Sequence, residues 1–177
     1  MFDAEPGARE AGADELSFEF LRAELEAVRP RRTAGEVIDA PMIGRLQFSR
    51  MPRGRPSFWH AEQQMPDSRF ALRVVCEVDG DRLPGADQMA CVVAFRRLQV
   101  QDAMLCAPLI NARLQLLRLS HRVTADDLVL TLIYLPPHPL TDARFELGFR
   151  VASIPQLLFT CVFGRGVPRS VRIDSDS

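Results

Sequence analysis

The chain has 177 residues, of which 47% are hydrophobic and 25% are charged, and its formal net charge is −1. A chain of this size and composition can fill the core of one domain and stay in solution, and its nearly balanced charge argues against a dedicated nucleic-acid binder. No apolar run reaches the ~18 residues that a membrane span needs, and the acidic N-terminus lacks the apolar stretch of a secretory signal, so we expect a cytoplasmic protein with no membrane partner.

Residues 1–13 are small and polar, which predicts a disordered N-terminus before a single domain at 14–173. From Asp14 to Val28, apolar residues recur at spacings of three and four, and acidic residues crowd the first turn. This pattern predicts an acidic amphipathic helix that ends before Pro30.

Residues 31–69 have no sustained period and are rich in proline and arginine, so we expect an irregular segment in which only Ile43–Phe48 alternates like a strand. The next two runs, Phe70–Val78 and Met89–Leu98, both have strand character. The connector between them contains two glycines and a proline, which favours an antiparallel hairpin with a longer loop.

Val100–Leu119 is the best candidate for a long helix, because its leucines and methionine cover most of the helix circumference. Pro108 must either begin this helix or kink it. Asp127–Leu135 is apolar on both faces, which is typical of a central strand that is covered on both sides.

Ala143–Ser153 fits two structures. Large apolar residues alternate with polar ones as in a strand, whereas a helix would gather the charged residues into a polar stripe; the bulky apolar set and a glycine favour the strand. Leu157–Phe163 and Val167–Ile173 flank G-R-G and predict a hairpin. A loose acidic tail is expected at 174–177.

These elements together predict one α+β domain. An antiparallel sheet of about five to seven strands packs against the long apolar helix, and the acidic amphipathic helix precedes it. The succession of acidic helix, antiparallel strands and apolar helix resembles the small α+β chaperones of bacterial secretion systems. This resemblance concerns the fold and is carried by no motif, so it implies a chaperone-like role only by analogy.

The cysteines and the cations limit the possible chemistry. None of Cys76, Cys91, Cys106 and Cys161 belongs to a Cys-x-x-Cys pair and each lies among apolar residues, so we expect buried free thiols, no metal site and no cofactor. All 22 cationic side chains are arginine, which excludes a lysine nucleophile.

The stretch L-S-H-R-V-T-A-D-D contains the residue types of a hydrolytic active site. A nucleophilic serine needs a base within hydrogen-bond reach and an acid behind that base, but neighbours in an extended chain, such as Ser120 and His121, point to opposite sides. A Gly-x-Ser-x-Gly elbow is also missing. We therefore interpret the stretch as a structural join in which Thr124, Asp126 and Asp127 bond local amides, and keep a small hydrolase as a second alternative.

The segment from Arg45 to Trp59 combines basic and aromatic residues without one acid. A protein interface is the preferred interpretation, ahead of internal packing on the acidic N-terminal helix and of a nucleic-acid surface. The expected partner-binding residues are Arg45, Phe48, Arg50, Arg53, Arg55, Phe58 and Trp59. We expect a non-enzymatic protein-interaction module, namely an adaptor, a chaperone-like protein or a subunit of a larger bacterial assembly, with a nucleic-acid-binding accessory subunit as the first alternative.

Overall fold

The computed structural model describes residues 33–40, 43–66, 68–142 and 144–175, which belong to one compact unit, Arg32–Ser177. Its strands are β1 (Val37–Ala40), β2 (Gly44–Ser49), β3 (Ser57–Gln64), β4 (Ala71–Val78), β5 (Leu128–Leu135), β6 (Arg144–Val151), β7 (Leu157–Gly164) and β8 (Val167–Ser175). The helical segments are α2 (Ala86–Leu116), a single 3₁₀ turn η1 (Ala125–Asp127) and α3 (Pro139–Asp142).

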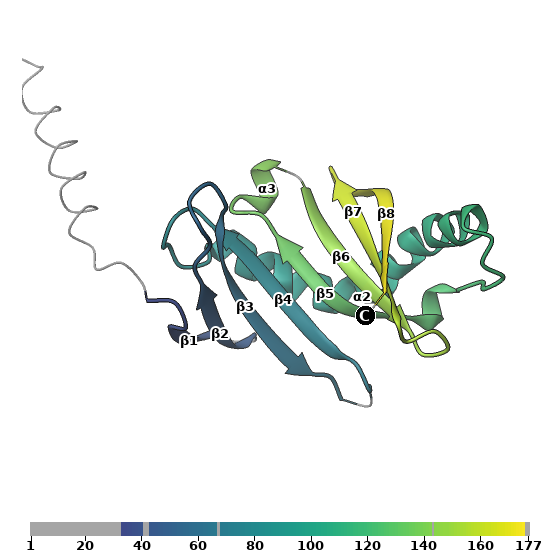
Figure 1. The fold of residues 1–177 in the computed structure, drawn as a ribbon, viewed down its shortest axis with the longest axis horizontal. Helices are drawn as coiled ribbons and strands as arrows, with labels where there is room; N and C mark the ends of the chain where they lie inside the picture. Colours follow the sequence, from purple (N-terminus) through teal and green to yellow (C-terminus); the bar gives the residue numbers. More distant parts are fainter. Residues whose placement is uncertain (1–32, 41–42, 67, 143, 176–177) are drawn as a thin grey trace, which may run out of the picture. The chain divides into compact units, whose positions relative to one another are not determined.

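The strands form one sheet in which spatial order follows chain order from β1 to β8 (Figure 1). Neighbouring strands are antiparallel with one exception, the parallel pair β4 and β5. A parallel connection needs a long crossover, and α2 provides it. The sheet therefore consists of two four-stranded meanders joined through α2.

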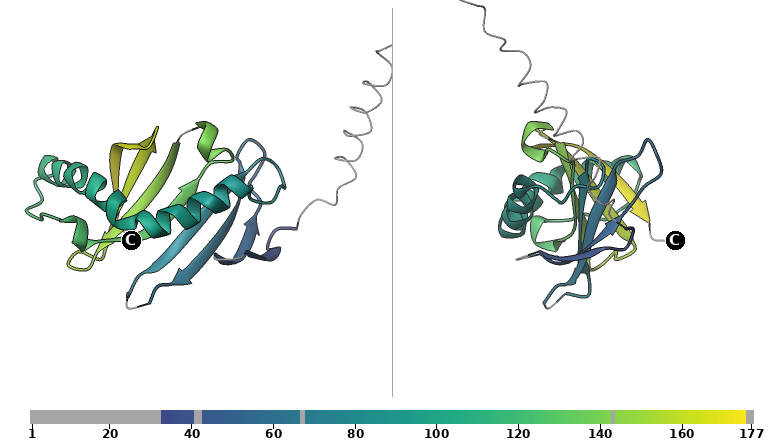
Figure 2. Two further views of the ribbon diagram at one scale, coloured as in Figure 1. Left: turned by 180° about the vertical axis from the view of Figure 1, so that it is seen from behind. Right: turned by 90° about the vertical axis from the view of Figure 1, so that its left-hand side faces the viewer.

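Helix α2 lies on one face of the sheet, as the two further views make plain (Figure 2). Side chains that meet across neighbouring strands on this face are fully buried, for example Trp59 with Cys76 and Leu147 with Cys161. One side of the helix is buried in the same core. The buried residues of α2 are Gln88, Val92, Ala103, Cys106, Ala107, Ile110 and Leu114. The core thus lies between the sheet and one side of α2.

Several predictions from the sequence are confirmed by these elements. The protein is α+β with a sheet packed on one long helix, although the sheet has eight strands rather than five to seven and contains one parallel pair. Within the ambiguous segment at 143–153, Arg144–Val151 form the strand β6. The hairpin at G-R-G is also present, and Arg165 and Gly166 adopt φ values of 54° and 75°, which a two-residue hairpin turn of this kind requires.

The predicted strand at Met89–Leu98 is wrong, because these residues form the first turns of α2. A local signal for the helix lies just before them. Gly85 occupies the N-cap position, and its backbone N–H donates to Oε1 of Gln88 at 2.9 Å, which is the backward half of a capping box. With that cap in place the chain runs as one helix to Leu116, and Pro108 lies inside it.

The expected irregular segment at 31–69 is wrong in extent, because it contains β1, β2 and β3. Of the described prolines, Pro52 and Pro56 lie between β2 and β3 and Pro66 follows β3, where a missing N–H costs no ladder bond. The strand at 127–135 is central as expected, but α2 covers only one of its faces. Leu132 and Tyr134 lie on the other face and are half-buried.

Two predictions concern the ends of the chain. The acidic amphipathic helix and the disordered stretch before it lie outside the described residues. At the other end, β8 continues to Ser175, so the strand includes the first two residues of the expected loose tail.

Candidate functional site

The aromatic residues expected to bind a partner lie in the core instead. Trp59 is 0% exposed and Phe48 is 1% exposed, and their ring centroids lie 5.1 Å apart. The indole Nε1 of Trp59 donates a hydrogen bond to the backbone carbonyl of Arg82 at 2.8 Å, so the polar end of the ring is satisfied internally. These two rings cannot anchor a partner or stack on a base unless the domain opens, and the prediction is corrected for both.

The remaining members of that set are scattered. Arg45, Arg53 and Arg55 are exposed, whereas Arg50 forms an ion pair with Asp81 at 2.6 Å. Phe58 is half-buried on the sheet face opposite α2, where its ring lies 5.8 Å from that of His60. The structure therefore brings no aromatic cluster together with these arginines on one surface. Packing of the segment on the acidic N-terminal helix concerns residues outside the described part.

The serine–histidine stretch is a join, as the sequence predicted. The Asp127 carboxylate accepts hydrogen bonds from the backbone N–H and the hydroxyl of Thr124, both at 2.7 Å, and closes the 3₁₀ turn η1. These bonds lower the pKa of Asp127. Ser120 and His121 are both exposed, and within the described chain no hydrogen bond links them to each other or to a carboxylate. The arrangement lacks the contacts of a nucleophile and its base.

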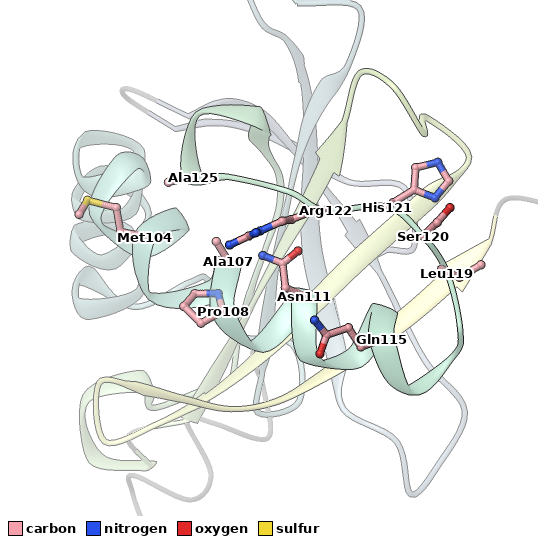
Figure 3. A pocket seen from close by; sticks show the side chains of 10 residues that line it. All are labelled: Met104, Ala107, Pro108, Asn111, Gln115, Leu119, Ser120, His121, Arg122 and Ala125. Carbon is pink, nitrogen blue, oxygen red and sulfur yellow. The ribbon is translucent and has the colours of Figure 1, made fainter.

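The same stretch has a second property, because it forms one wall of a groove. After Leu116 the chain reverses through Arg118, whose φ is 57°, and returns along α2. The groove between helix and return segment has a volume of about 740 Å³ (Figure 3). It is lined by Met104, Ala107, Pro108, Asn111 and Gln115 of α2 and by Leu119, Ser120, His121, Arg122 and Ala125 of the return segment.

Asn111 holds the two walls of this groove together. Its side-chain Nδ2 donates to the carbonyl oxygen of Val123 at 2.8 Å, and its Oδ1 accepts from the N–H of Val123 at 2.9 Å. A single amide side chain thus satisfies both backbone groups of a residue that is 4% exposed. Asn111 is the only asparagine in the chain, and its role here is structural.

Pro108 leaves one backbone carbonyl of the helical wall without its usual hydrogen-bond donor. Proline has no N–H, so the carbonyl oxygen of Met104, four residues earlier, cannot receive its usual helical hydrogen bond. Both residues line the groove, and both are exposed. This carbonyl is the one backbone acceptor of the described helical wall that the proline deprives of its usual donor.

The electrostatic character of the groove is cationic. Arg122 reaches from the return segment across the groove toward α2 (Figure 3), and the lining contains no carboxylate. An anionic group of a ligand would meet the Arg122 guanidinium here.

The outward side of α2 exposes large apolar side chains, which is unusual for a helix at a protein surface. Met104 is 63% exposed and Leu116 is 75% exposed, although the opposite side of the helix is buried against the sheet. Between Arg97 and Arg113, Asp102 is the only charged residue. Large apolar side chains that are exposed on a helix of this kind commonly mark a surface that a partner covers. This uncharged run is the signal in the sequence that points to the surface.

Other chemistry finds no support in the described residues. They contain no group of three or more metal-ligating side chains, and none of their helices combines the length and apolar character needed to cross a bilayer. The cysteines are free, as predicted. Burial raises the pKa of Cys76 to about 12, and a hydrogen bond to Cys161 together with burial raises the pKa of Cys106, which disfavours the thiolate form of both.

Comparisons of the chain with protein-family models, with curated proteins and with solved structures give no match.

Proposed function

We propose that this protein is a protein-interaction module, an adaptor or chaperone-like subunit, whose groove beside α2 binds a short segment of a partner protein. The observation that carries the proposal is the groove of about 740 Å³, which lies on a helix that exposes large apolar side chains. Exposed apolar surface of this kind on a folded domain is commonly an interaction site.

The lining favours a peptide segment that carries an apolar side chain beside a carboxylate. Met104 and Leu119 offer apolar contact, while the Arg122 guanidinium can bind a carboxylate through two parallel hydrogen bonds. Gln115 and the carbonyl of Met104 can bond a peptide backbone. Among the possible partners of a protein groove, an acidic, partly apolar segment matches these groups best.

The test uses a random peptide library displayed on phage and selected on the purified full-length chain. We expect enriched peptides that place Asp or Glu next to Leu, Met or an aromatic residue. Binding of one synthetic peptide, measured by fluorescence anisotropy, should weaken at least about ten-fold in the variants Arg122→Glu and Met104→Glu, as loss of a central interface contact commonly does.

Arg53→Glu is the matched control, because it reverses the same charge at an exposed position of the segment first expected to bind partners. Its affinity should equal that of the wild type. If the library yields no binder, or if Arg53→Glu alone abolishes binding, the groove is not the site. Cleavage of the selected peptides that Ser120→Ala abolishes would support the hydrolase instead.

A further inference from the structure

A row of leucines runs along α2 on the flank away from the groove. Leu98, Leu105, Leu109 and Leu116 follow one another at spacings of seven, four and seven residues, so they lie on one side of the helix. Leu98 is 43% exposed, Leu105 is 48% exposed, and Leu109 is half-buried. This spacing is the apolar seam through which two helices pack against each other.

The stripe and the groove lie on different flanks of α2. Consecutive residues of an α-helix are separated by about 100° around its axis, so Leu105 of the stripe and Met104 of the groove point in clearly different directions. A partner on the leucines therefore leaves the groove open, and the two surfaces can be tested separately.

Two charged residues border the leucine stripe, and both lack an ionic partner in the described part of the chain. Asp102 lies between Leu98 and Leu105, and its Oδ2 is buried without a hydrogen bond. Arg113 lies between Leu109 and Leu116 and takes part in no salt bridge there. The two residues are eleven positions apart, which is about 16 Å along one helix, so they cannot pair within the same α2.

A two-fold axis that crosses the stripe midway between Leu105 and Leu109 makes the stripe complementary to itself. With two α2 helices antiparallel about that axis, Leu98 lies opposite Leu116 of the partner subunit and Leu105 opposite Leu109 of the partner subunit. Asp102 then lies opposite the partner's Ala112 and next to the partner's Arg113. Symmetry repeats this acid–base juxtaposition, so each of the two unpaired charges meets its opposite.

We propose that two copies of this chain associate through antiparallel α2 helices, with the leucine stripe as the apolar seam and Asp102 paired with Arg113 of the partner subunit. A parallel pair would instead bring Asp102 to the level of the partner's Asp102 and Arg113 to the level of the partner's Arg113, so neither charge would meet its opposite. Closed two-fold dimers through one self-complementary surface are also the commonest soluble oligomers.

The experiment measures the mass of the full-length chain by sedimentation equilibrium over a range of concentrations. We expect a reversible dimer of twice 19.9 kDa. Leu105→Glu should give a monomer, and the single charge reversals Asp102→Arg and Arg113→Asp should each weaken association at least ten-fold. The double variant Asp102→Arg with Arg113→Asp should restore association to within about three-fold of the wild type, because the pair is exchanged rather than lost.

Arg97→Asp serves as the control, since it reverses a charge on the other flank of α2 and should leave association unchanged. Circular dichroism of each variant confirms that it is folded. A wild type that stays monomeric, or a dimer in which the double reversal is as weak as the single ones, overturns the proposal. Because Leu105→Glu should not change peptide affinity of the groove, failure of this inference is separate from failure of the proposed function.

Discussion

Removing the amide clamp at Asn111 should destabilise the protein strongly, although the residue is only half-buried. In Asn111→Ala the N–H and the carbonyl of Val123 both lose their partner, and Val123 is 4% exposed, so water replaces the amide poorly. A buried backbone group left without a partner costs about 1–3 kcal/mol. For two such groups, with some relaxation of the return segment, we expect a loss of about 2–4 kcal/mol in the free energy of unfolding.

Urea denaturation followed by tryptophan fluorescence measures this loss. Trp59 is the only tryptophan, and its burial in the core makes its emission a direct report of unfolding. Gln115→Ala is the control, because Gln115 lines the same groove but is exposed and is expected to change stability by less than about 0.5 kcal/mol.

The isosteric variant Asn111→Asp separates hydrogen bonding from packing. At neutral pH its carboxylate still accepts from the Val123 N–H, but it places a second oxygen against the Val123 carbonyl. We expect it to be at least as unstable as Asn111→Ala at pH 7 and to recover, relative to the wild type, as the pH falls and the carboxyl becomes a donor. A loss below about 0.5 kcal/mol in both variants would mean that the return segment is held by other contacts, and the groove would lose its fixed wall.

Three further changes test the core and its charges. Trp59→Ala should lower the free energy of unfolding by about 3–5 kcal/mol without weakening peptide binding to the folded protein. Weaker binding with unchanged stability would show that Trp59 contacts the partner. Burial raises the pKa of Asp102 from 3.8 to about 6, so its carboxylate destabilises the isolated fold increasingly as the pH rises from 4 to 7. At concentrations where the chain is monomeric, and after allowance for solvent screening, Asp102→Asn should raise the free energy of unfolding by about 1 kcal/mol at pH 7. At pH 4 the same variant should leave the free energy of unfolding unchanged. Gly148→Ala places a Cβ 2.6 Å from Cβ of Leu132 and should lower the free energy of unfolding by about 1–3 kcal/mol in a urea titration. Gly164→Ala should lower it clearly less, because the nearest neighbour of the new Cβ is a flexible side-chain atom at 3.3 Å.

The parts of the fold that the sequence predicted are those in which one pattern fits one environment. The apolar run at 127–135 had to be a central strand, because few exposed elements carry so many aliphatic side chains in succession. The alternation in 144–151 and the turn G-R-G indicated antiparallel strands. The pattern at Met89–Leu98 was misleading, since strand and helix both accommodate a short apolar run, and the capping interaction of Gln88 with Gly85 decides for the helix.

The candidate site could be predicted less well, because it depends on contacts far apart in the chain. The direction of Phe48 was available in principle, because it alternates with polar Gln47 and Ser49. Trp59 follows Phe58 and has no such pattern, and only its register with Phe48 across the two strands shows that it faces the core. The exposed arginines beside them gave the wrong impression of a surface motif. The groove arises only when the chain reverses after Leu116 and Asn111 clasps Val123, and no local pattern encodes that contact.

The two proposed surfaces of α2 together predict a consequence that neither has alone. A dimer through the leucine stripe keeps both grooves open and carries them on one rigid body, so it should bind a surface coated with the selected peptide through two sites at once. On such a surface, dissociation of the wild type should be about 10²-fold slower than dissociation of the monomeric Leu105→Glu variant, because the second contact forms at a high effective concentration. In free solution, where each peptide fills one groove, the two proteins should bind with equal affinity.

Surface plasmon resonance at high and at low peptide density distinguishes these cases. Equal dissociation rates at both densities would show that the grooves of one dimer cannot reach the same surface. A lower affinity of Leu105→Glu in solution as well would show that the leucine stripe belongs to the groove, and the division of α2 into two independent surfaces would have to be abandoned.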